Sequence, residues 1–167
     1  MLYYNTVNNL LKSTLHKLMK SEEFSEFRLV GGTALSLQLG HRISVDIDLF
    51  TGAEYGSIDF DKIEKYLKNN FPIVEYFSNV PVAFGRSYQI GDNINETVKL
   101  DVFYTDEFIE GFNFVDEIRL ATIAEILAMK LDVIQRGGRK KDFWDIHELI
   151  EKFTLKEMLS LHKHRYP

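Results

Sequence analysis

The chain has 167 residues, of which 45% are hydrophobic, and its 20 Lys and Arg against 25 Asp and Glu give a net charge of −5. A chain of this length corresponds to about one domain, and it buries enough surface to form a core without cross-links. The sequence has no Cys, which excludes a disulfide framework and a thiolate zinc site, and the acidic balance argues against broad electrostatic coating of nucleic acid.

The N-terminal segment, residues 1–5, has neither a cationic start nor a sustained apolar stretch, which argues against a signal peptide. No apolar run approaches the ~18 residues that a membrane-spanning helix requires. We therefore expect a single domain over residues 1–167, located in the cytoplasm and without a membrane partner.

The first third of the chain predicts helices that alternate with strands. Apolar residues at helical spacing over residues 7–19 predict a helix that Asn5 or Thr6 would cap. Further elements follow in order: a strand over 27–30 that stops at Gly31-Gly32, a helix over 33–39 that ends at Gly40, and a strand over 43–50. In this last strand Val45, Ile47 and Leu49 would face the core, and Ser44, Asp46 and Asp48 the opposite side.

The rest of the chain predicts a strand meander followed by helices. The expected elements are a helix over 59–71, strands within 73–104 with turns at 78–79, 91–93 and 105–106, and helices over 118–136, 141–153 and 155 to about 164. Five aromatic residues are interpreted as core: Tyr55, Phe60, Phe71, Phe77 and Phe84. The fold class is α+β, with a mainly antiparallel or mixed sheet flanked by helices, a catalytic core at about 25–105 and a helical C-terminal part at about 117–167.

Three aspartates are candidate metal ligands. Asp46 and Asp48 occupy positions i and i+2 of a strand and so share one face. If the predicted strand over 96–104 pairs with this strand, Asp101 joins them, and Lys99 lies on the same face. Three converging carboxylates repel one another strongly unless a cation is present, and a hard ion such as Mg²⁺ suits them. Taken alone, the Asp-x-Asp pattern is also typical of solvated loops.

Glycine and basic residues could complete a phosphate site. Gly31-Gly32 lies between a strand and a helix, where backbone N–H groups can cradle phosphate, although an ordinary tight turn would have the same sequence. Lys130 sits within an otherwise apolar helix, where it could reach a triphosphate or extend its ammonium into solvent. Residues 130–167 hold nine basic and six acidic residues, a local +3, whereas residues 1–129 hold 11 and 19, a local −8.

The motifs, taken in order, resemble those of the AbiEii/AbiGii toxin family within the nucleotidyltransferase superfamily to which DNA polymerase beta belongs. The first two are Leu29-Val30-Gly31-Gly32-Thr33-Ala34-Leu35 and, after thirteen residues that include His41-Arg42, Asp46-Ile47-Asp48. The later motifs are Lys99-Leu100-Asp101, the segment 126–130 that ends in Lys130, and the segment 139–146, Arg139-Lys140-Lys141-Asp142-Phe143-Trp144-Asp145-Ile146. The resemblance covers about residues 27–150.

The resemblance implies a nucleotidyltransferase fold and a set of site residues. The implied metal ligands are Asp46, Asp48 and Asp101. Lys130 and Asp142 would join them as the essential later lysine and aspartate. The implied nucleotide-binding residues are Gly31, Gly32, Thr33, Arg42, Ser44, Lys99, Lys130 and Arg139. For Asp145, an intrahelical pair with Lys141 or a capping role is as plausible as catalysis.

The leading hypothesis is a Mg²⁺-dependent enzyme, with Mn²⁺ as the alternative ion, that moves a nucleoside monophosphate from an NTP to an acceptor hydroxyl and releases pyrophosphate. The resemblance implies a bacterial toxin or abortive-infection role, an RNA acceptor such as a tRNA 3′ end, and a cognate antitoxin. A protein or small-molecule acceptor is the second hypothesis. The third is a degenerate transferase that binds nucleotide or RNA without turnover.

Overall fold

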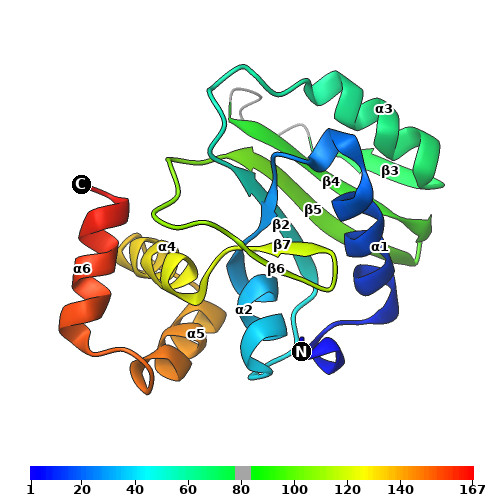
Figure 1. Cartoon of the computed structure of the whole chain (residues 1–167). Coiled ribbons are helices and arrows are strands. Elements are labelled where there is room, and N and C mark those ends of the chain that lie inside the picture. Colours follow the sequence, from blue (N-terminus) through cyan, green and yellow to red (C-terminus); the bar gives the residue numbers. More distant parts are fainter. Residues whose placement is uncertain (78–83) are drawn as a thin grey trace.

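The computed structural model describes residues 1–77 and 84–167, and its strands form one mixed seven-stranded sheet (Figure 1). The spatial order is β3-β4-β5-β2-β1-β7-β6, with β2–β5 and β1–β7 parallel and the other pairs antiparallel. The strands are β1 (Arg28–Leu29), β2 (Asp46–Thr51), β3 (Ile73–Tyr76), β4 (Gly85–Asn93), β5 (Glu96–Tyr104), β6 (Asn113–Val115) and β7 (Ile118–Leu120). The expected α+β class with a mixed sheet is confirmed.

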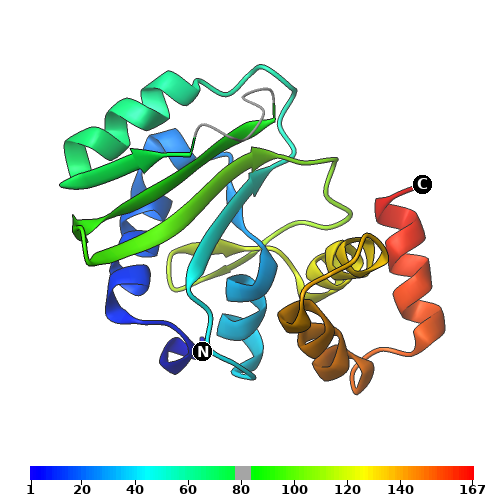
Figure 2. The same cartoon turned by 180° about the vertical axis from the view of Figure 1, so that it is seen from behind.

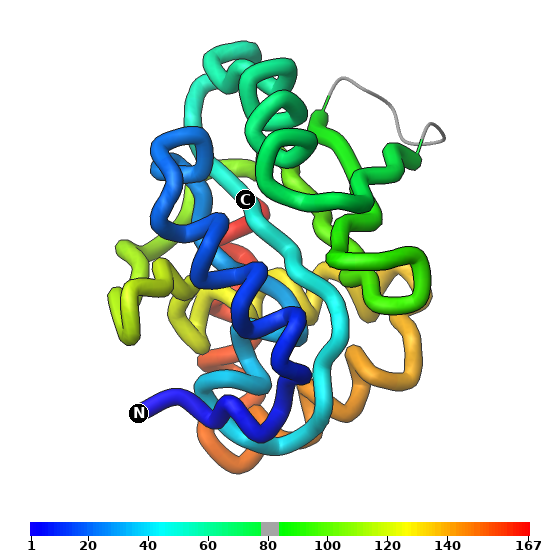
Figure 3. Tube along the Cα trace, turned by 90° about the vertical axis from the view of Figure 1, so that its right-hand side faces the viewer, coloured from blue at the N-terminus to red at the C-terminus, as the bar shows by residue number. Residues whose placement is uncertain are grey.

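The helices form two groups around this sheet (Figures 1 and 2). They are α1 (Asn9–Lys20), α2 (Gly31–Leu39), α3 (Phe60–Asn70), α4 (Ile123–Gln135), α5 (Lys140–Ile150) and α6 (Leu155–Arg165), with short 3₁₀ turns at Tyr4–Thr6 and Glu22–Phe24. Helices α1 and α3 lie against one face, and α4, α5 and α6 form a cluster on the other side of the sheet. Figure 3 looks from the side of α1, which lies in front, with the C-terminal helix behind.

The main core lies between α1 and the central strands. Leu11, Leu15 and Leu18 of α1 are at most 1% exposed and belong to the same apolar cluster as Ile47 of β2 and Leu100 of β5. Burying a side chain of this size contributes about 1.5–3 kcal/mol. Because side chains alternate along a strand, this burial turns the odd-numbered residues of β2 toward α1 and leaves its aspartates on the other face.

The N-terminal helix was expected to have its cap at Asn5 or Thr6, but the cap is Asn8, whose side chain accepts a hydrogen bond from the Leu11 N–H at 2.8 Å. Residues 4–6 instead form a 3₁₀ turn. The backbone N–H of Ser44 donates to the carbonyl of Thr6, so this turn holds the segment that leads into β2.

The strand predicted over 43–50 is wrong at its start, because β2 begins at Asp46. Ile43 and Val45 are 64% and 58% exposed rather than buried. Their segment bonds to the N-terminal turn instead of to a neighbouring strand, so the alternation of residue types there reflects no sheet pairing.

The helix predicted over 118–136 is also wrong at its start. Ile118–Leu120 is strand β7, which follows β6 through a two-residue turn in which Asp116 and Glu117 have φ of 51° and 64°. The helix starts only after Thr122, whose side chain accepts the N–H of Glu125. A segment of three residues such as Ile118–Leu120 is too short for the spacing of its apolar residues to distinguish a strand from a helix.

The aromatic residues expected in the core divide into two groups. Phe71 is buried and Phe60 packs against the core, but Tyr55, Phe77 and Phe84 are 62%, 43% and 61% exposed.

The turn predicted at residues 78–79 lies outside the described residues. Within residues 1–77 and 84–167, none of the helices has the length and apolar character needed to cross a membrane.

Candidate active site

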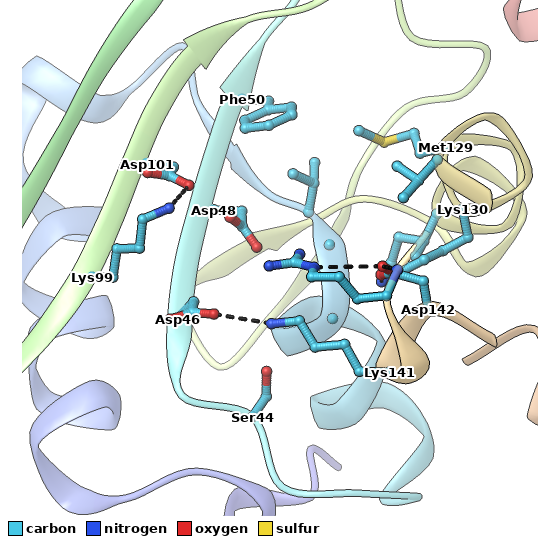
Figure 4. A pocket seen from close by; sticks show the side chains of 16 residues that line it. Ser44, Asp46, Asp48, Phe50, Lys99, Asp101, Met129, Lys130, Lys141 and Asp142 are labelled. Carbon is cyan, nitrogen blue, oxygen red and sulfur yellow. Dashed lines mark hydrogen bonds and ion pairs between the residues drawn. The ribbon is translucent and has the colours of Figure 1, made fainter. Parts of the chain in front are cut away.

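The three candidate metal ligands lie on one face of two adjacent parallel strands (Figure 4). In the register of β2 and β5, Asp46 is opposite Lys99 and Asp48 is opposite Asp101. The pairing that the sequence required for Asp101 to join the Asp46-Asp48 pair is therefore present. The apolar residues between the acids anchor both strands in the core, so the carboxylates are mounted on rigid backbone.

Lysines pair with the two outer carboxylates. Lys99 Nζ lies 2.5 Å from Asp101 Oδ2, and Ser87 donates to the other oxygen of Asp101 at 2.6 Å. Lys141 Nζ, from α5, lies 3.1 Å from Asp46 Oδ2. Asp48 lies between these two pairs (Figure 4). Burial, followed by the charges of Asp101 and Asp46, raises the pKa of Asp48 to about 6.

This donor set suits a hard divalent cation. Carboxylate oxygens are the ligands that Mg²⁺ prefers. Burial, together with the charges of Asp101 and Asp46, raises the pKa of Asp48, so a bound cation would favour its ionised form. In the part of the chain that the structure describes, no three His, Cys, Asp or Glu side chains converge in a preformed metal site.

The glycine pair opens α2 beside the acids. Gly31 is the first residue of α2 and has φ of +67°, a backbone conformation that residues with a Cβ adopt only with strain. A Cβ on Gly31 would lie 2.5 Å from Asp48 Oδ2, and one on Gly32 would lie 2.3 Å from Arg42 Nη2. Both positions therefore need glycine for a close approach, and the helix N-terminus they form suits an anion.

Thr33 and Ser44 hold the backbone that carries the acids. Thr33 is 1% exposed, and its hydroxyl donates to the carbonyl of Asp46 and lies 2.8 Å from Ser44 Oγ. The hydroxyl of Thr33 is thus occupied with holding the start of β2 in place. Ser44 is 6% exposed and still contributes to the pocket lining.

Lys130 faces the acids from α4 and is held by α5. Its Nζ lies 2.6 Å from Asp142 Oδ1 and 2.7 Å from Asp145 Oδ2, and the residue is only 6% exposed. Burial alone would raise the pKa of Asp142, but the hydrogen bond and charge of Lys130 lower it below the usual value. Lys130 is therefore a fixed cation in a buried ion-pair network, not one that extends into solvent.

Asp145 is the centre of that network and is fully buried. Arg42 donates to both of its oxygens, at 2.6 and 2.8 Å, and His41 Nε2 lies 2.8 Å from Oδ1. Burial would raise the pKa of Asp145, but the hydrogen bonds from Arg42 and His41, with the charge of Lys130, lower it strongly. The alternatives considered for Asp145, a pair with Lys141 or a cap, are both incorrect, since its partners are Lys130 on α4 and, about a hundred positions earlier in the chain, His41 and Arg42.

These groups enclose one cavity of about 200 Å³ (Figure 4). Its lining includes ten of the residues predicted for the site: Gly31, Gly32, Ser44, Asp46, Asp48, Lys99, Asp101, Lys130, Arg139 and Asp142. Two others, Thr33 and Arg42, lie behind this lining and support it. The sequence reasoning missed Lys141 and an apolar end formed by Phe50, Met129 and Val133.

Comparison with known proteins gives a family match and several structural relatives. A family model described as "Nucleotidyl transferase AbiEii toxin, Type IV TA system" matches residues 14–166. An uncharacterised protein of Aquifex aeolicus is 27% identical over 93% of this chain and 73% of its own length.

Two solved structures share the fold. A putative nucleotidyltransferase from H. pylori superposes with a TM-score of 0.62 at 23% identity, over 92% of this chain and 71% of that one. MenT4, a nucleotidyltransferase toxin of Mycobacterium tuberculosis, superposes with a TM-score of 0.59 at 14% identity, over 89% of this chain and 59% of its own.

Proposed function

Because the chain belongs to the family of AbiEii nucleotidyltransferase toxins, we propose that it transfers a nucleoside monophosphate from an NTP to a hydroxyl of an RNA acceptor, with Mg²⁺ as cofactor. Family membership makes the protein a nucleotidyltransferase. The metal, the acceptor and the role as the toxin of a toxin–antitoxin pair are the proposal.

One observation carries the proposal. Three carboxylates on a rigid sheet face a helix N-terminus and a buried lysine across a single cavity (Figure 4). An acid cluster by itself would suit many functions, and so would a basic one. Their opposition suits a bound metal–triphosphate, which brings both signs of charge.

The residues of the cavity have separate tasks in this reaction. Asp46, Asp48 and Asp101 would hold Mg²⁺, which when bound neutralises phosphate charge and activates the attacking hydroxyl. The N–H groups at Gly31-Gly32 and the ammonium of Lys130 would bind and orient the triphosphate. Catalysis of phosphoryl transfer consists mainly of such positioning and charge stabilisation.

The proposed transfer forms one bond to phosphorus and breaks another. The acceptor hydroxyl attacks the α-phosphorus of the NTP, the bond from that phosphorus to the bridging oxygen breaks, and pyrophosphate leaves. Asp101 lies on the strand next to the Asp46-Asp48 pair and is the proposed acceptor of the hydroxyl proton.

The test is transfer of label from an α-labelled NTP to total RNA, with Asp46→Asn and Asp48→Asn as variants and the exposed Asp92→Asn as the matched control. We expect both site variants to abolish transfer, since each keeps the side-chain shape while removing charge, and the control to retain it. Transfer that survives both substitutions would contradict the assignment, provided that circular dichroism shows all three proteins folded.

The same assay separates the alternative functions. Label in protein or in a small-molecule pool, with none in RNA, would change the acceptor but keep the chemistry. NTP binding by calorimetry without pyrophosphate release would favour a binding protein. A cognate antitoxin, expected from the type of family, would be identified by its ability to suppress transfer.

A further inference from the structure

The outer side of α5 carries an exposed surface that begins at the nucleotide cavity and extends beyond it. We call it the Trp144 surface and define it as Lys140, Lys141, Phe143 and Trp144. Phe143 and Trp144 are 52% and 54% exposed, and Lys140 Nζ lies 4.8 Å over the Trp144 ring. Their helical neighbours Asp142 and Asp145 are buried, so the helix presents opposite sides to the interior and to solvent.

Local stability does not account for these aromatic residues. An exposed cation–π pair contributes about 0.5–1 kcal/mol, which is less than a large apolar side chain gains from burial. Adjacent large apolar side chains left in water are typical of a surface that another molecule covers.

The Trp144 surface is continuous with the catalytic cavity. Lys141 lines the cavity and pairs with Asp46 at 3.1 Å, and Trp144 lies three positions further along α5, on the neighbouring part of the helix surface. A ligand that reaches the acids past α5 would therefore pass over Lys141 and Trp144. Ile43 and Val45 are also exposed and lie in the segment that leads into Asp46, the β2 residue with which Lys141 pairs.

We propose that the Trp144 surface binds the unpaired nucleotides next to the 3′ hydroxyl of the RNA acceptor. A base stacks on the Trp144 ring, and Lys140 and Lys141 contact the flanking phosphates. Single-stranded nucleic acid is held by this combination of aromatic faces and cations. The inference rests on the proposed function and adds to it the place where the acceptor lies.

Charge complementarity selects RNA over a protein partner. Residues 130–167 carry a local +3 in a protein with a net charge of −5, and part of that excess lies at the start of α5. A strand of phosphates next to a reacting 3′ end matches a short basic and aromatic strip.

The chain supplies its own probe, because Trp144 is its single tryptophan. We expect an unstructured RNA oligonucleotide with a free 3′ end to quench tryptophan fluorescence on binding, and the same strand within a blunt duplex to quench it much less. The measurement needs neither NTP nor turnover. Absence of quenching at RNA concentrations that give binding by anisotropy would overturn the proposal.

Substitutions test the same surface with fluorescein-labelled RNA. Trp144→Ala and Lys140→Ala are each expected to weaken binding by roughly tenfold, and Trp144→Phe to recover much of the loss because it keeps an aromatic face. The matched controls are Phe114→Ala, another exposed aromatic residue, which lies on β6, and Lys65→Ala, an exposed lysine on α3. Equal binding by Trp144→Ala and the controls would also overturn the proposal.

Failure of this inference is distinguishable from failure of the proposed function. RNA binding with quenching but no label transfer would support the surface and contradict the transferase. Label transfer to RNA with an unchanged KM for RNA in Trp144→Ala would support the transferase and contradict the surface. Binding of a cognate antitoxin to Trp144 in place of RNA would contradict the surface as well.

Discussion

Replacing Asp145 by Asn tests whether the buried ion-pair network holds α5 against the rest of the site. Asp145 is fully buried, and its partners Arg42 and Lys130 have side chains that are 13% and 8% exposed. The amide keeps the shape but removes the charge that both cations face. Breaking one partner of a buried ion pair costs about 3–5 kcal/mol.

The expected loss is measurable by thermal denaturation. Asp142 still pairs with Lys130 in the variant, so we place the cost toward the lower end of that range, at about 3 kcal/mol. For a chain of this length each kcal/mol lowers Tm by roughly 2–4 °C, which gives a fall of roughly 6–12 °C. The control is Glu151→Gln, an exposed acid just after α5, which should change Tm by little.

The pH dependence of this difference has a definite sign. The pKa of Asp145 is lower in the folded protein than in the unfolded chain, so its stabilisation is fully present above the unfolded value of about 3.9 and is lost as pH falls toward the folded value. The Tm difference between the protein and Asp145→Asn should stay constant from neutral pH to about pH 5 and shrink below about pH 4. A variant that melts with the parent at neutral pH would refute the reasoning, and so would a gap that widens in acid.

Three further substitutions probe the acid side of the cavity. Gly31→Ala should abolish transfer and destabilise the fold by about 1–2 kcal/mol, because φ at Gly31 is +67° and the new Cβ would collide with Asp48. The control for both assays is Gly111→Ala, where a Cβ would have no atom within 4 Å. Lys141→Met should raise the affinity of the nucleotide-free protein for Mn²⁺, measured by calorimetry, because it removes the cation that competes for Asp46; equal or weaker binding would contradict this. Asp48→Asn should raise Tm at neutral pH in the presence of a chelator, because the raised pKa of Asp48 means that its ionised form destabilises the folded protein there. The gain in Tm should vanish below about pH 4, where the carboxyl is protonated in the folded and the unfolded state. An unchanged or lower Tm at neutral pH would show that ionised Asp48 does not destabilise the fold.

The acid face of the sheet could be predicted because its information is local. Alternation within β2 and β5 assigns Asp46, Asp48 and Asp101 to the side away from the core, and only the pairing of two strands had to be assumed. The glycine pair was identified for a similar reason, since Gly31-Gly32 follows a strand directly, although the two glycines form the start of α2 and do not precede it.

The contacts across the cavity could not be predicted because they join distant segments. Lys141 meets Asp46 across 95 positions, and Arg42 meets Asp145 across 103. Sequence spacing places Asp142 and Asp145 on one helix face but does not say what that face meets. Nearby charges on the same helix gave plausible local partners, and the tertiary partners were the ones that formed.

The cations of the cavity come mainly from α4 and α5, whereas three of its four acids, Asp46, Asp48 and Asp101, come from the sheet. The ion pair between Lys141 and Asp46, which joins the two sides, takes the place of the charges that a metal–triphosphate would bring. Lys141 neutralises Asp46 where a metal would, and the same Lys141 is then unavailable to phosphate. A metal or a phosphate arriving alone would release only one member of that pair and leave the other unpaired. A metal–triphosphate brings a cation for Asp46 and anions for Lys141 together, so it can replace both partners in one event. Asp46, Asp48 and Asp101 belong to the −8 body, and Lys130, Arg139 and Lys141 belong to the +3 C-terminal part, so the opposition of charges in the cavity follows the direction of the split along the sequence.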